Sequence, residues 1–301
     1  MKINYLLVVL LASALISCNK TDVSAVDESE ILVSASVVET RAGYEGTSVL
    51  PSTFVMDIDQ SGINYDYSTV TMTKGSDNSY TSNTKLLWAE STHTADIKAM
   101  TIPYGWTYVD AQNPMDISVS TEQNTASNVQ ASDLIGATSS KGATISGSTI
   151  NLAFNHLMSK LEVVYELGAG FNGNKVKVRS IVLQNVCIGG GFSYSDMNFD
   201  ASVEPTYGDI TMYHDAANYK AEAIFFPYQP TTNPTLSMSV VSNEIVYTLS
   251  CPIVPNGNNG FVSGKKYKIK VAVVSSAINQ TSATIEQGWN VVSDNPSFAT
   301  E

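Results

Sequence analysis

One run of residues has the spacing of the first half of a calcium-binding loop: Asp57, Asp59, Ser61 and Gly62. Such a loop wraps closely spaced oxygen ligands around a hard cation and needs a glutamate at its twelfth position. That position is Ser68 in this sequence, and the flanking residues do not have the pattern of helices. We therefore predict a hairpin turn here and no metal site.

The three histidines, His93, His156 and His214, lie far apart and do not have the spacing of metal ligands. His156 lies in an apolar stretch, where a hydrogen-bonded structural histidine is the expected role. Residues 189–191 are three glycines, but they lead into Phe192 and not into a helix, so they cannot place a phosphate at a helix N-terminus. The sequence also contains no nucleophile elbow. We predict no enzymatic activity and no cofactor.

A different chemistry, lipid attachment, is indicated at the N-terminus. Lys2 and the apolar run over residues 5–16 form a secretory signal that is too short to span a bilayer permanently. Ser17 and Cys18 complete a bacterial lipobox, in which the Cys18 thiol is acylated and becomes the new N-terminus. We expect residues 1–17 to be a lipoprotein signal peptide and residues 18–30 to be a flexible tether. Acyl chains such as palmitate would anchor Cys18 in the outer membrane.

A possible cleavage site follows the first predicted strand. In residues 31–43 the apolar side chains alternate with small polar ones, as in a half-buried strand. Leu32 and Val38 interrupt this alternation, so the strand could be buried on both faces. Arg41 comes directly after it, next to Ala42 and a glycine that leave the backbone open to a protease. A first strand that ends at a cleavable bond can be removed, although an ordinary strand followed by a surface arginine fits the same residues.

The chain is acidic, with 16 Lys and Arg against 28 Asp and Glu, a formal charge of -12. Removing residues 1–17 takes away Lys2 and no acidic residue, which gives about -13. Such a surface argues against nucleic acid or anionic lipid as a partner. Of the cysteines, Cys187 and Cys251 would remain beside Cys18, either as a disulfide or as two buried free thiols.

Most of the chain is predicted to be β-structure, because Ser, Thr, Val, Ile and Tyr dominate and turn residues recur at short intervals. The predicted strands are 52–59 and 65–74, which form a hairpin, and 80–88, 95–103, 175–186, 220–227, 234–241, 245–251 and 266–275. Residues 103–106 are predicted as a turn, and residues 121–132 as a long connection with at most a short helical turn. This regular spacing of short strands favours β-sandwiches over alternating α/β units.

Residues 139–148 are rich in small side chains and form the predicted boundary between an N-terminal sandwich at 31–147 and a C-terminal one at 148–301. The stretch that follows, 149–167, has the strongest periodicity in the chain. We expect a bulge near residues 156–159, which would let Phe154 and Leu161 face the C-terminal core together. A helix over the middle of this stretch is the competing interpretation.

Several segments together resemble the Bacteroidales fimbrillins, which are subunits of lipoprotein-derived surface pili. Asp133-Leu134-Ile135, followed by residues 150–161, resembles the family's Asp-Leu and Phe-x-His-x-x-Ser-Lys-Leu pattern. Residues 261–267 resemble its Phe-x-Ser-Gly-Lys-x-Tyr segment, and residues 285–289 resemble its closing Ile-x-x-x-Trp. With Cys18 and Arg41, the resemblance covers nearly the whole chain in the right order.

The resemblance implies an all-β fold of two consecutive, transthyretin-like β-sandwich domains and a stalk or tip subunit that serves adhesion. In family members that polymerise, an arginine-specific protease cuts after the first strand, and an extended segment of a neighbouring subunit fills the groove that is left. Carried onto this sequence, the cut falls between Arg41 and Ala42 and removes the lipid on Cys18 together with residues 31–41. The outer-membrane, surface-exposed lipoprotein would then enter the fimbrium, with other pilus subunits as its partners.

Two other roles fit the same residues. An uncut, lipid-anchored surface lipoprotein could bind glycan or protein, with Tyr104, Trp106 and Tyr108 as an aromatic platform for sugar. A pilus anchor subunit would also keep its lipid. Sequencing of the mature N-terminus separates these roles from a processed subunit, which should begin at Ala42 and not at acylated Cys18.

Overall fold

The structure is a computed structural model, and it describes residues 30–37, 50–60, 66–76, 79–88, 95–106, 114–141, 149–168, 171, 176–254 and 260–286. The predicted signal peptide, the tether up to residue 29, Arg41 and Ala42 lie outside these residues, and so does Cys18. Within them, the chain forms eighteen strands and one short helix. The prediction of an all-β fold is therefore confirmed.

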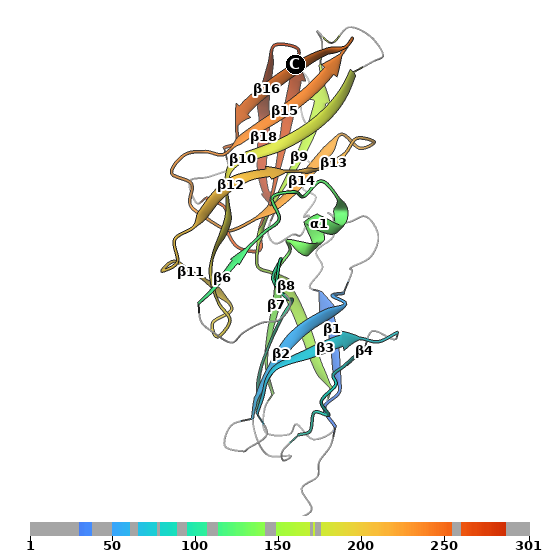
Figure 1. Cartoon of the computed structure of the whole chain (residues 1–301), viewed down its shortest axis with the longest axis vertical. Helices are drawn as coiled ribbons and strands as arrows, with labels where there is room; N and C mark the ends of the chain where they lie inside the picture. Colours follow the sequence, from blue (N-terminus) through green and yellow to red (C-terminus); the bar gives the residue numbers. More distant parts are fainter. Residues whose placement is uncertain are drawn as a thin grey trace, which may run out of the picture.

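The N-terminal half is a closed sheet of seven strands, drawn in the lower part of Figure 1. Its strands are β1 (Val33–Val37), β2 (Thr53–Gln60), β3 (Tyr67–Lys74), β4 (Ser79–Thr81), β5 (Ala95–Met100), β7 (Ile135–Lys141) and β8 (Ile150–His156). They follow the order β1-β4-β3-β2-β5-β7-β8 around the barrel. The predicted hairpin is confirmed as β2 and β3, which pair antiparallel. The predicted two-layer sandwich is not seen in this half, because β1 joins β4 to β8 and closes a single sheet.

The interior of the barrel is filled by aromatic and long aliphatic side chains. Phe54 lies at its centre, with ring centroids 4.7 Å from Tyr80 and 5.1 Å from Phe154. Trp88 and Met56 are fully buried beside them. Aromatic rings in such tilted and edge-on contacts contribute about 0.5–1.5 kcal/mol per pair beyond their burial. The barrel therefore has a core of its own.

The C-terminal half consists of two sheets with one core between them. The six-stranded sheet contains β10 (Val176–Ser193), β15 (Thr235–Ser242), β16 (Ile245–Pro252), β11 (Asn198–Asp200), β12 (Thr206–Thr211) and β6 (Met115–Ser118). The five-stranded sheet has the order β13 (Tyr213–Asp215), β14 (Lys220–Phe225), β9 (Ser159–Leu167), β17 (Lys266–Val274) and β18 (Ala277–Glu286). Side chains of both sheets, such as Ile181 and Val163, meet in this core.

The only helix among the described residues, α1 (Ala126–Ala131), lies where the two halves meet in Figure 1. The hydroxyl of Thr125 caps it by accepting a hydrogen bond from the backbone N–H of Asn128. Only Val129 of the helix is buried. The prediction of a long connection with a short helical turn over residues 121–132 is confirmed.

The chain passes from the barrel to the C-terminal sheets at Leu157 and Met158, between β8 and β9. Phe154 belongs to the barrel core and Leu161 to the C-terminal core, so the prediction that both face one core is wrong. Neither a bulge nor a helix forms, because β8 and β9 are separate strands in different sheets and each buries its own alternating face. The domain ranges remain a prediction, and the sheet pairing would move their limit from residue 148 to about residue 157.

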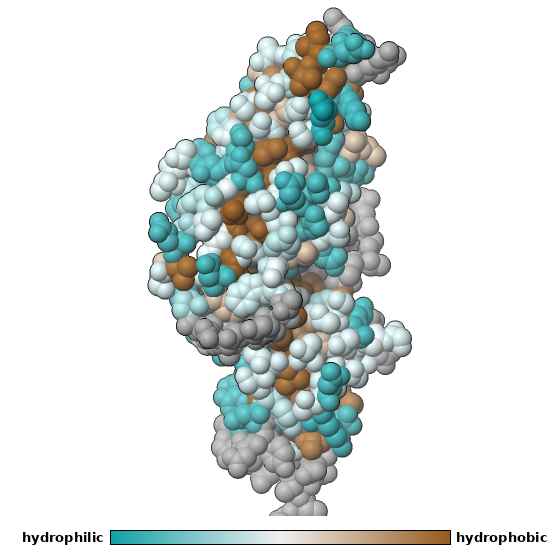
Figure 2. Space-filling view, in the orientation of Figure 1, coloured by the Kyte–Doolittle hydropathy of each residue, from teal (hydrophilic) through white to brown (hydrophobic). Residues whose placement is uncertain are grey.

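The surface view in Figure 2 shows hydrophobic residues in small separate groups among hydrophilic ones. The exposed large apolar side chains include Leu32, Ile245 and Val246, each at least half exposed. Isolated apolar residues of this kind are normal on a protein surface. Within the described parts of the chain, no helix has the length and apolar character needed to cross a membrane.

Candidate functional site

Strand β1 is the part of the structure on which closure of the barrel depends. It runs parallel to β8 over five register positions, from Val33 opposite Ile150 to Val37 opposite Phe154. On its other side it runs antiparallel to β4 over only two positions, with Val33 opposite Tyr80. Since β1 is the only strand between β4 and β8 in the order of the sheet, its removal would leave both of them as edges.

The two faces of β1 differ strongly in burial. Ile31 and Val33 are 5% and 3% exposed and contact the barrel core, while Ala35 and Val37 pack half-buried against it. Leu32 on the other face is 56% exposed, so burial on both faces is ruled out at this position. The apolar alternation seen in the sequence is thus the alternation of a strand buried on one face.

Hydrogen bonds hold the beginning of β1 on both sides. The backbone N–H of Ile31 donates to the carbonyl of Leu86 over 2.9 Å, and the N–H of Ile150 donates to the carbonyl of Leu32 over 2.7 Å. Further along, the hydroxyl of Ser34 donates to the side-chain oxygen of Asn151. Because the pairing with β4 stops at Ser34, the residues from Ala35 to Val37 are paired with β8 alone among the described strands.

The segments quoted for the family resemblance come together at the crossover between the halves. His156, the last residue of β8, lies with its Nδ1 atom 2.8 Å from a carboxylate oxygen of Asp133. The predicted structural role of His156 is therefore supported by a partner that lies 23 residues away in the sequence. The Ser159 hydroxyl donates to the carbonyl of Val262 over 2.9 Å, which joins the first motif to the second.

The second motif forms the turn that leads into β17. The ring of Tyr267 packs against Phe261 at 4.9 Å, and its hydroxyl donates to the Gly260 carbonyl over 3.0 Å. The same hydroxyl accepts a hydrogen bond from the N–H of Val262 over 2.7 Å. These contacts give the aromatic positions of the motif a structural role at the end of the C-terminal core.

The central strands of the five-stranded sheet carry a buried network of charges. Lys160 on β9 lies 2.7 Å from Glu222 on β14, and Glu162 on β9 lies 2.7 Å from Lys266 and 3.1 Å from Lys268 on β17. The Glu162 and Lys266 side chains are 3% and 1% exposed. Burial alone would raise the pKa of Glu162, but attraction and hydrogen bonds from the two lysines outweigh it and lower this pKa to about 2.

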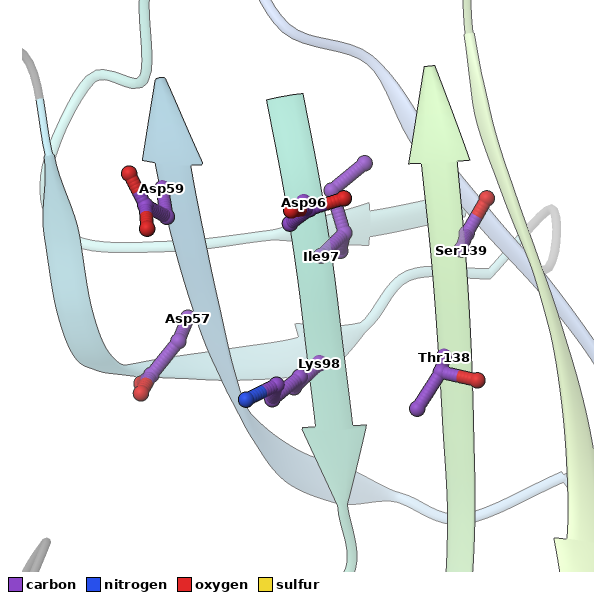
Figure 3. Close-up of a pocket in the computed structure, with 7 residues that line it drawn as sticks. All are labelled: Asp57, Asp59, Asp96, Ile97, Lys98, Thr138 and Ser139. Atoms are coloured by element: carbon purple, nitrogen blue, oxygen red, sulfur yellow. The ribbon is translucent and has the colours of Figure 1, made fainter. Parts of the chain in front are cut away.

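A shallow pocket lies on the outer face of the barrel, over β2, β5 and β7 (Figure 3). Asp57 and Asp59 lie opposite Lys98 and Asp96 in the register, and Figure 3 shows the Lys98 amine pointing toward β2. Asp57 accepts a hydrogen bond from the N–H of Thr69, and Lys98 donates to the carbonyl of Ser195 in the β10–β11 hairpin. Asp57 of the calcium-like run thus has a role in the hairpin, and its neighbour Lys98 joins the two halves. Ser61 and Gly62 lie outside the described residues.

Among the described residues, the other sequence candidates have separate surroundings. His214 is far from His156 in the chain and lies 2.6 Å from the hydroxyl of Tyr165, while His93 is outside the described residues. Within the described ranges, no three His, Cys, Asp or Glu side chains are grouped as metal ligands. Cys187 and Cys251 are buried free thiols. Trp106 packs partly buried against the C-terminal core, Tyr104 is exposed, and Tyr108 lies outside the described residues, so the aromatic platform stays a prediction.

A sequence model of the fimbrillin-like family matches residues 45–289, which is most of the chain. The chain belongs to the fimbrillin-like family. The match includes both motifs at the crossover and begins just after the predicted cleavage site at Arg41. No curated protein matches the chain by sequence.

Solved structures share the fold of this fimbrillin-like chain at low sequence identity. A proposed cell adhesion protein of Bacteroides uniformis has a TM-score of 0.65 and 14% identity, covering 88% of this chain and 100% of its own. One from Bacteroides ovatus has a TM-score of 0.65 and 16% identity, with coverage of 88% and 99%. The C-terminally truncated tip fimbrial protein Mfa3 of Porphyromonas gingivalis has a TM-score of 0.52 and 13% identity, with coverage of 86% and 99%.

The positions that sequence reasoning missed are those that act through contacts distant in the chain. Gly264 has a positive φ of 68°, and a side chain on it would lie 2.8 Å from the carbonyl oxygen of His156. The family motif marks this glycine, but its spacing alone does not reveal which strand it contacts. Asn151 and Leu86, which bond to β1, likewise lie far from it in the sequence.

Proposed function

We propose that this protein is a structural subunit of a cell-surface pilus, either stalk or tip, and that it assembles by exchange of its first strand. Membership of the fimbrillin-like family supports the role of pilus subunit. The observation that carries the proposal of strand exchange is the position of β1, which alone joins β4 to β8 and has two register positions with β4. In this scheme Cys18 is acylated for export, and a cut after Arg41 later releases the lipid and β1.

Removal of β1 would create a receptor with both backbone and side-chain complementarity. The edges of β4 and β8 would present unpaired N–H and C=O groups, which bind an added strand by β-augmentation. The sites of Ile31 and Val33 would become apolar pockets, each worth about 1.5–3 kcal/mol when filled by a branched side chain. A replacement strand must therefore carry apolar residues at alternate positions that match these two pockets.

The test uses the chain from residue 19 onward, which lacks the predicted lipid, and an arginine-specific protease. The sequence contains one other arginine, Arg179, which lies inside β10 between the paired residues Val178 and Ser180. Because pairing in a sheet hinders access of a protease to the backbone, we expect one cut, after Arg41. Mass spectrometry should then show a fragment that begins at Ala42, and Arg41→Ala should remain whole.

The cut protein should form ordered oligomers that electron microscopy detects, while the Arg41→Ala protein stays monomeric under the same protease. If loss of β1 only destabilises the barrel, amorphous aggregate is expected instead. A cut protein that stays a stable monomer, even with other pilus subunits added, would refute strand exchange. An anchor subunit, or an uncut lipoprotein that binds glycan or protein, would then be the better assignment.

A further inference from the structure

Besides packing in the barrel core, β8 is held in the sheet by β1 and β7 and, at one end, by the crossover. In the described residues, β8 pairs with its other neighbour, β7, at only two positions, Ile135 opposite His156 and Gly136 opposite Asn155. Both positions are at the end of β8 that enters the crossover. The opposite part of the strand, from Ile150 to Phe154, is paired with β1. Without β1, this part of β8 would be held from its His156 end.

The crossover itself is fixed by hydrogen bonds from two other segments. The N–H of Leu157 donates to the carbonyl of Leu134 over 2.9 Å. The carbonyl of Leu157 accepts from the hydroxyl of Ser263 over 2.6 Å, and the carbonyl of Met158 accepts from the N–H of Gly264 over 2.9 Å. Three backbone groups of the crossover are thus satisfied from the segment after α1 and from the turn before β17.

Gly264 brings the turn before β17 directly against the end of β8. Its φ of 68° is in the left-handed region, and an added Cβ would lie 2.8 Å from the His156 carbonyl oxygen. Real Cβ atoms do not come so close to a backbone oxygen, so a side chain here would have to displace either the turn or β8. The pair of His156 and Asp133 also holds this residue, through the segment after α1.

From these contacts we infer that Gly264, Ser263 and the Asp133–His156 pair are positioning residues for the receptor strand β8. They hold β8 at the crossover, so that the groove left between β4 and β8 keeps its shape when β1 is removed. This inference deepens the proposed strand exchange and rests on it for its biological purpose. β8 thus has two supports, β1 and the crossover, and either support is sufficient to hold its His156 end in place.

If β8 has two supports, substitutions that weaken both should act in synergy. Hydrogen exchange of the whole uncut chain can measure this synergy. Val33→Asp places a charge in an apolar site and should release β1 from the barrel. Amides of 31–37 and of 150–154 should then exchange faster, because each strand loses its partner, while the amides of 155–157 stay protected by β7 and by the crossover. Gly264→Ala alone should leave 155–157 protected, because β1 still holds the rest of β8. With both substitutions, exchange over 155–157 should rise at least tenfold above the product of the single effects.

Gly105→Ala is the matched control, because Gly105 also has a positive φ, 79°, but has no atom within 4 Å of an added Cβ. Combined with Val33→Asp, it should not increase exchange over 155–157 beyond that of Val33→Asp alone. Ser263→Ala removes one hydrogen bond without backbone strain and should reproduce the synergy in weaker form, which covers the case that Gly264→Ala does not fold. If Val33→Asp alone exposes 155–157 as fully as the double variants do, the inference is refuted. Since no step requires cleavage or assembly, this result is independent of the test of strand exchange.

Discussion

Replacing Glu162 with glutamine tests whether the buried charge network stabilises the C-terminal half. Its carboxylate lies 2.7 Å from the Lys266 amine, and both side chains are at most 3% exposed. The pKa of Glu162 is lowered from 4.5 to about 2, which corresponds to about 3 kcal/mol in favour of the ionised form in the folded protein. Removing one partner of a buried pair leaves the other charge without compensation, at a cost of about 3–5 kcal/mol. We expect Glu162→Gln to lose about that amount at pH 7.

The loss should depend on pH with a definite sign. A carboxylate whose pKa is lower in the folded state contributes stability above its unfolded pKa, and this stability is lost as the pH falls toward its folded pKa. The difference in unfolding free energy between the wild type and Glu162→Gln should therefore be complete above about pH 5.5. It should shrink between pH 4.5 and 2, because the wild-type side chain becomes neutral there.

Urea unfolding followed by circular dichroism at several pH values measures this difference. Glu166→Gln is the matched control, since Glu166 lies on the same strand and is exposed. It should change the stability by less than about 0.5 kcal/mol. A second variant, Glu162→Leu with Lys266→Met, should recover most of the stability, because apolar replacement of a whole buried pair is often neutral. A deficit in Glu162→Gln that is equally large at pH 7 and pH 2.5 would refute the electrostatic explanation.

Three further predictions concern single positions. Phe154→Ala should destabilise the barrel by about 3–5 kcal/mol, seen as an earlier urea transition in the fluorescence of buried Trp88, and a loss below about 1 kcal/mol would contradict its central position. Burial raises the pKa of the Cys187 thiol to about 11, so at pH 8 a thiol reagent followed by mass spectrometry should label it only after unfolding; rapid labelling of the native protein would show that the site opens. Gly260→Ala should lower the melting temperature more than Gly105→Ala, because its added Cβ would lie 2.6 Å from the Tyr228 carbonyl oxygen; equal melting temperatures would contradict this.

Local alternation was sufficient to predict several long strands of the C-terminal half, but not β18, Ala277–Glu286, nor the part of β10 beyond residue 186. The predicted strand 266–275 is β17, Lys266–Val274, and 245–251 is β16, Ile245–Pro252. Each buries one face against the core, so apolar and polar residues alternate along its own sequence. The short strands β6, β11 and β13 were not predicted. They form because they pair with neighbouring strands, and three or four residues are too few to show a period of two.

Closure of the barrel could not be predicted from local alternation, for a related reason. β1 pairs with β8, whose residues lie more than a hundred positions later, and a period of two says nothing about which strand is the neighbour. The same limit applies to the crossover. The alternation before and after His156 was correctly identified, but the sequence does not show that the two halves of that stretch face different cores. The family motif identified the residues that matter there, while their contacts with Asp133 and Gly264 required the structure.

β1 is held less firmly than β9, the strand that follows the crossover, and this difference suits the proposed exchange of β1. β9 pairs with β14 over six positions and with β17 over eight, and ion pairs join it to both neighbours. β1, by contrast, pairs over five positions with β8 and over two with β4. Loss of β1 therefore breaks the smaller set of contacts, in the half that has its own core. Because β8 continues into the firmly held β9, the C-terminal half can fix the base of the strand that would receive a replacement.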